Sequence, residues 1–240
     1  MKKLREIFRA TLALFYPPTC EGCRANIEAG EYLCETCRSR APRIVPPFCS
    51  KCSEPFSGAI TTAFSCSNCA NQTLHFEAAV AAYRAHGIVR RLIHEFKYDQ
   101  REYLRHVIGG WLAEVLNDGR LDPAQFDVIV PVPLHPTKLR ERGFNQAQLL
   151  AQSLSTRTDL PMKLALERVR FTRTQTAFDR AERMQNLRDA FRLRAGQDVQ
   201  RLRVLLVDDV LTTGSTLSEC ARVLKKSGAS SVYAATAARA

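Results

Sequence analysis

The sequence of 240 residues lacks a long apolar segment. Near its start, Arg9 interrupts the apolar residues, and the run from Ala10 to Tyr16 is too short for a secretory signal or a membrane span. Low-complexity tracts are also missing, and the only repeat is a cysteine motif. The apolar residues of 1–18 follow helical spacing before two prolines. We therefore expect an amphipathic helix that packs onto the protein, with binding to a membrane surface as the alternative.

Acidic residues are the scarcer charged class, with 24 Asp and Glu against 35 Lys and Arg and a formal charge of +11. Most of this excess lies in residues 78–240, where 26 basic residues stand against 17 acidic ones. A basic domain of this kind favours a polyphosphate ligand, a nucleic acid, or both.

Eight of the nine cysteines form four Cys-x-x-Cys knuckles, and none of the five histidines shares that spacing. Zinc binds four thiolates tetrahedrally, so the eight sulfurs predict two structural zinc sites in a double zinc ribbon at residues 19–75. Without a secretory signal, a disulfide framework is the weaker interpretation. Pairing consecutive knuckles gives ordinary loops, while a crossed arrangement remains open. The predicted ligands are Cys20, Cys23, Cys34, Cys37, Cys49, Cys52, Cys66 and Cys69.

Strand and helix patterns alternate through residues 76–240, which predicts an α/β domain with a mostly parallel sheet and helices on both faces. Expected helices cover residues 88–98, 102–116 and 145–155, and expected strands cover residues 78–83, 127–132, 191–194, 203–207 and 232–238.

The most informative segment follows the predicted strand that ends at Val207. Two carboxylates, Asp208 and Asp209, stand at its expected end, and a hydroxyl-rich turn then opens a helical pattern. The N-terminus of a helix favours an anion, and ionised carboxylates accept hydrogen bonds from vicinal hydroxyls. The segment therefore predicts a sugar-phosphate site and resembles the phosphoribosyl pyrophosphate signature of the type I phosphoribosyltransferase fold. The turn consists of Thr212, Thr213, Gly214, Ser215 and Thr216.

A second loop follows the strand at residues 127–132. It begins with Val132, Pro133 and Leu134, and several cations, among them Arg142, come after it. A loop at the carboxyl end of a strand with cations behind it suits a pyrophosphate group, although its prolines reduce the number of N–H donors. The alternative is a proline-stiffened turn with a solvated basic helix start.

The segment from Arg168 to Arg203 holds ten arginines and only four acidic residues. Such composition is typical of a loop that folds over a substrate, of a nucleic-acid contact, or of a solvated surface. Its aromatics are limited to Phe171, Phe178 and Phe191, so phosphate contacts would dominate binding of single-stranded DNA.

Several motifs, in their order along the chain, resemble those of the ComF family, which includes the ComFC and GntX-like proteins. They begin with Phe15-Tyr-Pro-Pro-Thr-Cys-Glu-Gly-Cys and the remaining knuckles and end with the Asp-Asp signature. Between these ends stand Leu92-Ile-His-Glu-Phe-Lys-Tyr, Val132-Pro-Leu, Arg142-Gly-Phe-Asn-Gln, Arg173-Thr-Gln-Thr and Asn186-Leu-Arg-Asp-Ala-Phe. The resemblance covers essentially the whole chain. It implies a zinc ribbon joined to a phosphoribosyltransferase-like domain and a role in natural competence or use of external DNA.

The same resemblance implies roles for the site residues. Asp208 and Asp209 would hold the ribose hydroxyls of phosphoribosyl pyrophosphate, the turn at 212–216 its 5′-phosphate, and the loop at 132–134 its pyrophosphate. Arg142 and Arg173 would neutralise the pyrophosphate, and Arg173 would act in catalysis with the two aspartates. A magnesium ion would bind the pyrophosphate and diol with few protein ligands.

Two functions follow from the resemblance. One is phosphoribosyl transfer to an acceptor that the sequence leaves open, since little sequence after the last strand serves as the hood that usually recognises a nucleobase. The other is a DNA-handling accessory factor that keeps the pocket without turnover. Single-stranded DNA and DNA-uptake proteins are the expected partners, in the cytoplasm, with a place at the inner face of the membrane as the alternative.

Overall fold

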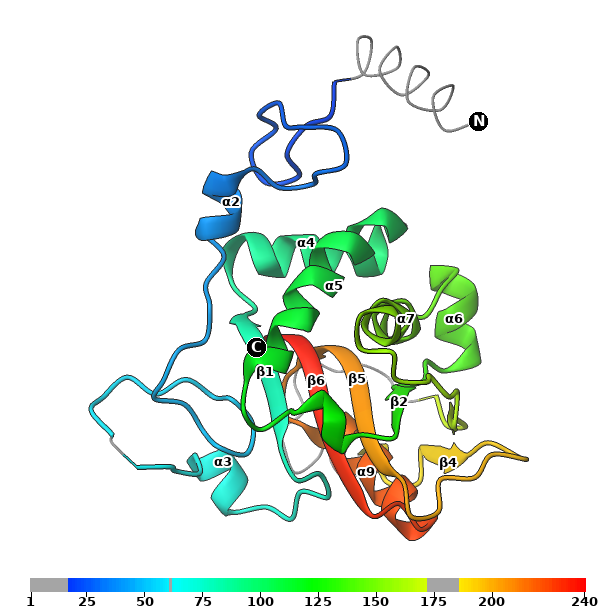
Figure 1. Cartoon of the computed structure of the whole chain (residues 1–240). Helices are drawn as coiled ribbons and strands as arrows, with labels where there is room; N and C mark the ends of the chain where they lie inside the picture. The colour runs from blue at the N-terminus through cyan, green and yellow to red at the C-terminus, as the bar shows by residue number, and fades with distance from the viewer. Residues whose placement is uncertain (1–16, 61, 172–185) are drawn as a thin grey trace.

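The computed structural model describes residues 17–60, 62–171 and 186–240 (Figure 1). The expected helix at 1–18 falls almost wholly outside these ranges, and so does Arg173. Among the described residues, no helix has both the length and the apolar character needed to cross a membrane.

A four-stranded parallel sheet forms the centre of the molecule and confirms the predicted α/β class. Its strands are β1 (Ala79–Arg84), β2 (Val128–Pro131), β5 (Arg203–Leu211) and β6 (Ser231–Arg239), in the order β1-β6-β5-β2. All three strand pairs are parallel. The strands are nearly continuous apolar runs because both faces of the sheet are covered.

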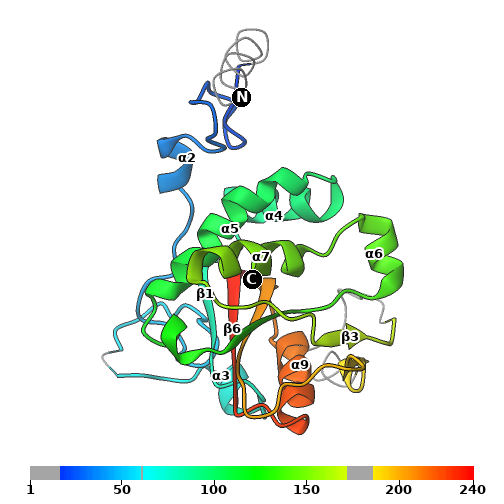
Figure 2. The same ribbon diagram turned by 45° about the vertical axis from the view of Figure 1, so that its right-hand side comes forward.

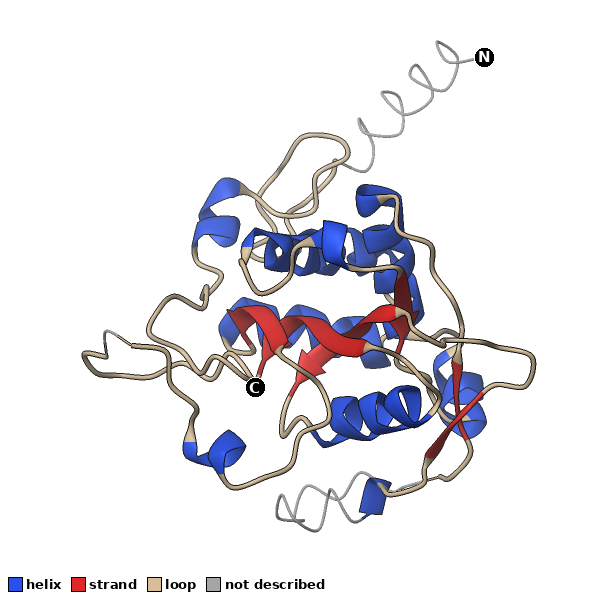
Figure 3. Cartoon of the chain, turned by 60° about the horizontal axis from the view of Figure 1, so that its bottom comes forward, coloured by secondary structure: helices blue, strands red, loops and turns tan. Residues whose placement is uncertain are grey.

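Helices cover both faces of this sheet (Figure 3). One face packs against α5 (Arg105–Ala113) and α7 (Gln146–Thr158), with α4 (Gly87–Tyr98) beside them, and the other face packs against α9 (Ser215–Lys226). Figure 2 shows α7 lying across the strands, with α6 (Pro136–Arg142) next to its start.

Successive residues of β5 point to opposite faces, as in any strand. Leu205 and Val207 belong to the core under α5 and α7, whereas Val204 and Leu206 belong to the core under α9. This alternation also decides which way the residues after Val207 point.

The predicted strand at 191–194 exists but lies outside the main sheet. It forms β4 (Phe191–Leu193), which pairs antiparallel with β3 (Leu166–Arg168), a strand that the sequence pattern did not indicate. The prediction of one helix over 102–116 is wrong in extent. Within that range only α5 is α-helical, and tight turns of 3-10 helix stand at both of its ends. These turns are η1 (Glu102–Leu104) and η2 (Glu114–Asn117), and a third, η3 (Pro123–Gln125), precedes β2.

The cysteine-rich segment forms two small units with one short helix each, α2 (Glu35–Ser39) and α3 (Ser67–Ala70). In Figure 1 the first unit lies beside α4 and the second beside the lower half of β1. The second unit is joined to the sheet by Ser53, whose hydroxyl donates to the carbonyl of Ala79 (3.1 Å) and accepts from the N–H of Ala81 (3.3 Å).

Candidate functional site

The hydroxyl-rich turn lies between the end of β5 and the start of α9. Gly214 has a φ of +79°, a left-handed conformation that favours glycine, and it stands at the N-cap of α9 without a side-chain cap. The hydroxyls of Thr213 and Ser215 share a hydrogen bond of 2.8 Å. The first N–H groups of α9 therefore face the turn and suit a phosphate group.

The two aspartates lie inside β5 and not after it. The ladder to β6 continues through Asp208 and ends at Leu211, so the expectation that the strand ends at Val207 is wrong. The regular register keeps the alternation of side chains. Asp208 therefore points toward α9, and Asp209 toward α4.

Asp209 forms an ion pair with Lys97 near the end of α4, with 2.8 Å between the carboxylate oxygen and the amine. The side chain of Asp209 is 7% exposed and that of Lys97 22% exposed. Burial alone would lower the pKa of Lys97, but the carboxylate of Asp209 outweighs it and raises that pKa above its usual value. The amine is thus held in its charged form next to the candidate site.

Asp208 has a different environment. Burial, together with the charge of Asp209, raises the pKa of Asp208 to about 7. The charges of Lys97 and Arg168 offset only part of this effect. One oxygen of Asp208 accepts a hydrogen bond from the N–H of Asp209 at 2.9 Å. The two neighbouring carboxylates therefore differ in their surroundings: Asp209 has a cationic partner in Lys97, and Asp208 has no such ion pair among the described contacts.

The loop after β2 lies next to the same edge of the sheet. The N–H of Val132 donates to the carbonyl of Val207 (2.9 Å), and the side chain of Asn145 donates to the carbonyl of Val132 (3.0 Å). Pro133 is buried and Leu134 is half-buried. The loop is thus fixed from both sides.

Arg142 belongs to α6, a helix that lies behind this loop. Its guanidinium donates to Gln146 (2.7 Å) and stacks over the ring of Tyr98 at 5.0 Å from the centroid. Arg142 and Lys97 line one small pocket together with Tyr98, Gln100, Lys138 and Glu141. Arg142, the cation predicted for the pyrophosphate, therefore lies beside Lys97, whose amine pairs with Asp209.

The eight knuckle cysteines form two groups of four, each with sulfur atoms within 4.8 Å of one another. Consecutive knuckles pair, so the crossed arrangement is wrong: Cys20, Cys23, Cys34 and Cys37 make one group, and Cys49, Cys52, Cys66 and Cys69 the other.

The spacing of the sulfur atoms matches a tetrahedral zinc site. The sulfur–sulfur distances from Cys23 to Cys34 and from Cys52 to Cys66 are both 3.7 Å. Zinc–sulfur bonds in a tetrahedron place the sulfurs about 3.8 Å apart. Both groups fit structural zinc.

Comparison with known proteins agrees with this division. Residues 11–74 match the double zinc ribbon domain, and residues 97–240 match the phosphoribosyl transferase domain. Competence protein F of Haemophilus influenzae is 32% identical over 231 residues, covering 94% of this chain and 99% of that protein. The chain belongs to the ComF family.

Two further relatives support the assignment to the ComF family. DNA utilization protein YhgH of Escherichia coli is 34% identical over 223 residues, covering 91% of this chain and 96% of that protein. Competence protein ComFC of Bacillus subtilis is 26% identical over 220 residues, covering 89% and 86% of the two chains.

Two cations of this ComF-family site were given no role by sequence reasoning. Lys97 lies in a motif that carried the resemblance, and a lysine on the apolar face of α4 was the available signal, since Ile93 one turn earlier is buried. Arg168 at the end of β3 stacks over Phe191 at 5.3 Å, and burial lowers its pKa. No sequence pattern marked Arg168 as different from the other arginines of its segment.

Proposed function

We propose that this ComF-family protein binds phosphoribosyl pyrophosphate with magnesium at the carboxyl edge of its sheet. The observation that carries the proposal is the N-terminus of α9, where Gly214 offers no side-chain cap, a few residues after the carboxylates of Asp208 and Asp209. Backbone N–H groups suit the 5′-phosphate, and the carboxylates suit the ribose hydroxyls. The loop at 132–134 and Arg142 supply the neighbouring pyrophosphate region.

Magnesium fits this proposal as an ion carried mainly by the ligand. Asp209 is already paired with Lys97, and the pKa of Asp208 is raised to about 7. Within the described ranges, only the two cysteine groups bring three or more metal-binding side chains together. Oxygen atoms of the diol and the pyrophosphate must therefore complete the coordination.

A bound donor of this kind allows phosphoribosyl transfer. The acceptor would form a bond to ribose C1′ while the bond from C1′ to the pyrophosphate oxygen breaks, and the cations of the site would stabilise the departing pyrophosphate. Arg173, outside the described residues, is proposed to contribute there. Release of pyrophosphate from the labelled donor, screened against nucleobases, amines and DNA, identifies the acceptor class.

The decisive binding test replaces both site carboxylates. Asp208→Asn with Asp209→Asn should weaken the binding of magnesium phosphoribosyl pyrophosphate by more than about tenfold, because each charged acceptor contributes on the order of 1.5 to 3 kcal/mol. Isothermal calorimetry measures the change. Asp127→Asn is the matched control, because Asp127 pairs with Arg203 at the amino end of the same strand. Equal affinity of the double variant and the control would exclude this site.

A second candidate function is direct handling of single-stranded DNA during DNA uptake, in the cytoplasm or at the inner face of the membrane. The relatives named for competence and DNA utilization favour it, as do the exposed side chains of Arg188, Arg192 and Arg194. Proteins of the DNA-uptake machinery would be the partners in this role.

The DNA proposal predicts binding that weakens steeply as salt rises. Replacing Arg188, Arg192 and Arg194 by Ala should lower the slope of log affinity against log salt by about 0.7 for each phosphate that the protein no longer neutralises. Fluorescence anisotropy with labelled oligonucleotides of several sequences measures both slope and preference. If the triple variant keeps the affinity and slope of the parent, DNA contact through this segment is excluded.

A further inference from the structure

The first cysteine unit presses its opening knuckle against α4. Gly22 lies between Cys20 and Cys23, and a Cβ atom there would stand 2.4 Å from the sulfur of Cys37 and 2.7 Å from Ile88 at the start of α4. Only a glycine allows so close an approach. The backbone of the knuckle is therefore in direct contact with the helix.

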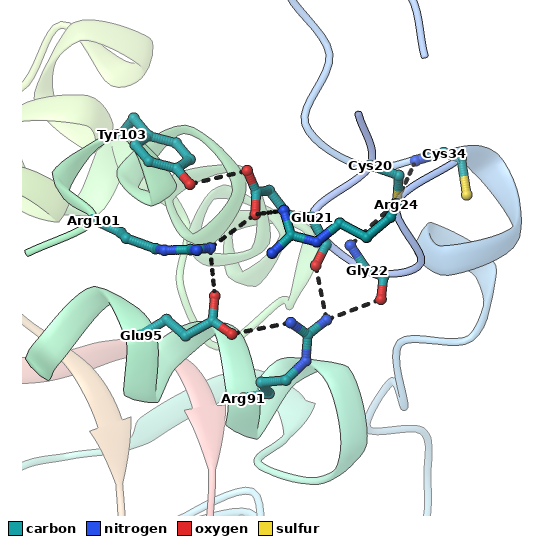
Figure 4. Close-up of polar contacts among 9 residues, drawn as sticks. All are labelled: Cys20, Glu21, Gly22, Arg24, Cys34, Arg91, Glu95, Arg101 and Tyr103. Carbon is teal, nitrogen blue, oxygen red and sulfur yellow. Dashed lines mark hydrogen bonds and ion pairs between the residues drawn. The ribbon is translucent and has the colours of Figure 1, made fainter. Parts of the chain in front are cut away.

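A polar network ties the same knuckle to the rest of α4 (Figure 4). Arg91 donates to the backbone carbonyls of Glu21 (2.8 Å) and Gly22 (3.0 Å) and to the carboxylate of Glu95 (3.0 Å). Arg101, just after α4, bonds the carboxylates of both Glu21 and Glu95 at 3.0 Å. Because Glu21 stands inside the knuckle, zinc binding fixes its backbone and thereby the network.

Tyr103 adds two further contacts between the large domain and the ribbon. Its hydroxyl donates to Glu21 at 2.9 Å, and its ring stacks with Tyr32 of the ribbon at 6.0 Å. The side chains of Glu21 and Glu95 are only 12% and 15% exposed. Charge-assisted hydrogen bonds that are shielded to this degree are stronger than ordinary surface ion pairs.

The end of α4 that this network holds also carries Lys97. Glu95 and Lys97 stand in the last turn of the helix. Glu95 bonds Arg91 and Arg101, the two arginines that also reach the ribbon, and Lys97 pairs with Asp209 of β5. The helix has a buried apolar face of its own, formed by Val89, Leu92, Ile93 and Phe96. The core therefore holds the helix as a whole, and Arg91 and Arg101 give its last turn a second anchor on the ribbon.

We propose that the first zinc ribbon is a positioning element of the phosphoribosyl site, with Glu21, Arg91, Glu95 and Arg101 holding the last turn of α4 so that Lys97 neutralises Asp209. These four are positioning residues, since they touch neither carboxylate of the site. The inference rests on the proposed function for its meaning, but the position of Lys97 is testable without any ligand.

The test measures the reactivity of single lysines toward an acetylating reagent by mass spectrometry. In Arg91→Met with Arg101→Met, acetylation of Lys97 should rise about fivefold, the factor that loss of roughly 1 kcal/mol of pairing energy gives. Lys138, which lines the same pocket, is the internal standard. Arg203→Met, which removes an ion pair at the amino end of β5, should change nothing. Arg101→Lys with Arg91 intact should restore most of the protection.

Zinc analysis accompanies each variant, because the network must be weakened without emptying the metal sites. If the double variant loses zinc, Glu95→Gln decides, since it leaves in place both arginines that contact the ribbon. Unchanged acetylation of Lys97 with two zinc ions retained would overturn the proposal. Calorimetry with magnesium phosphoribosyl pyrophosphate is the second measurement. Wild-type protein that binds no ligand would refute the proposed function, while the lysine data would still decide the positioning role.

Discussion

Loss of the second zinc ion will unfold the whole protein, whereas loss of the first will leave the α/β domain folded. Three cysteines of the second site, Cys49, Cys52 and Cys69, are buried in the core under α9, whereas the first site has two buried cysteines, in the core under α5 and α7, and an exposed Cys23. A structural zinc ion contributes on the order of 10 kcal/mol to a small module, about the whole stability of a typical domain. The protein should carry about two zinc ions, because it has two groups of four thiols.

Contacts between the second ribbon and the large domain explain why its loss spreads. Arg120 donates to the carbonyl of Ser50 (2.9 Å) and to the hydroxyl of Ser53 (3.1 Å). Glu54 pairs with Arg239, a buried residue at the end of β6. The first ribbon meets the large domain through the polar network on α4 and through Cys20, Leu33 and Cys37, which are buried in the core under α5 and α7, but it exposes Cys23 and none of its hydrogen bonds in this network reaches a strand of the sheet.

Cys23→Ser and Cys52→Ser form a matched pair, since each is the second cysteine of its site. Circular dichroism and metal analysis should show one zinc and a folded sheet for Cys23→Ser, and a largely unfolded chain for Cys52→Ser. Identical melting curves for the two variants would contradict the asymmetry. One zinc ion or none in the parent protein, together with paired cysteines, would contradict both sites.

Local patterns were sufficient to predict the zinc ligands and the fold class. The knuckles place eight thiols at short, regular spacing, and the apolar runs of the strands reflect burial on both faces. The turn at 212–216 was found because a glycine, several hydroxyls and a helix start are adjacent in the chain. In each case the residues that act together are neighbours in sequence or repeat with a fixed period.

The properties that the sequence did not reveal depend on contacts between distant segments. Nothing near Lys97 shows that its amine meets Asp209, because the pair forms only when α4 lies over the end of β5. The carboxylates after Val207 also indicated the end of the strand, whereas pairing with β6 continues β5 to Leu211. Long-range pairing therefore decided both the end of the strand and the faces on which its carboxylates lie.

The two adjacent aspartates should have opposite effects on stability. Asp208 has a pKa near 4 in the unfolded chain and about 7 in the folded protein. Between these values the folded protein holds a proton that the unfolded chain has released, so the free energy of unfolding falls as pH rises through this window. Asp208→Asn removes the charge and can keep the hydrogen bond from the N–H of Asp209. It should stabilise the protein at pH 8 by about 1 to 3 kcal/mol and have little effect at pH 4.

Asp209→Asn should act in the other direction, because it leaves the amine of Lys97 mostly buried without its carboxylate. We expect a loss of about 1 to 3 kcal/mol at pH 8, somewhat less than for a fully buried pair, since Lys97 keeps some contact with water. Urea unfolding at pH 4 and pH 8 measures both variants, with Asp127→Asn as the control. If both variants change the free energy of unfolding in the same direction at pH 8, the predicted difference between the two carboxylates is wrong. Opposite signs, with both variants losing affinity for phosphoribosyl pyrophosphate, would show that Asp208 is a carboxylate kept for binding at the expense of stability.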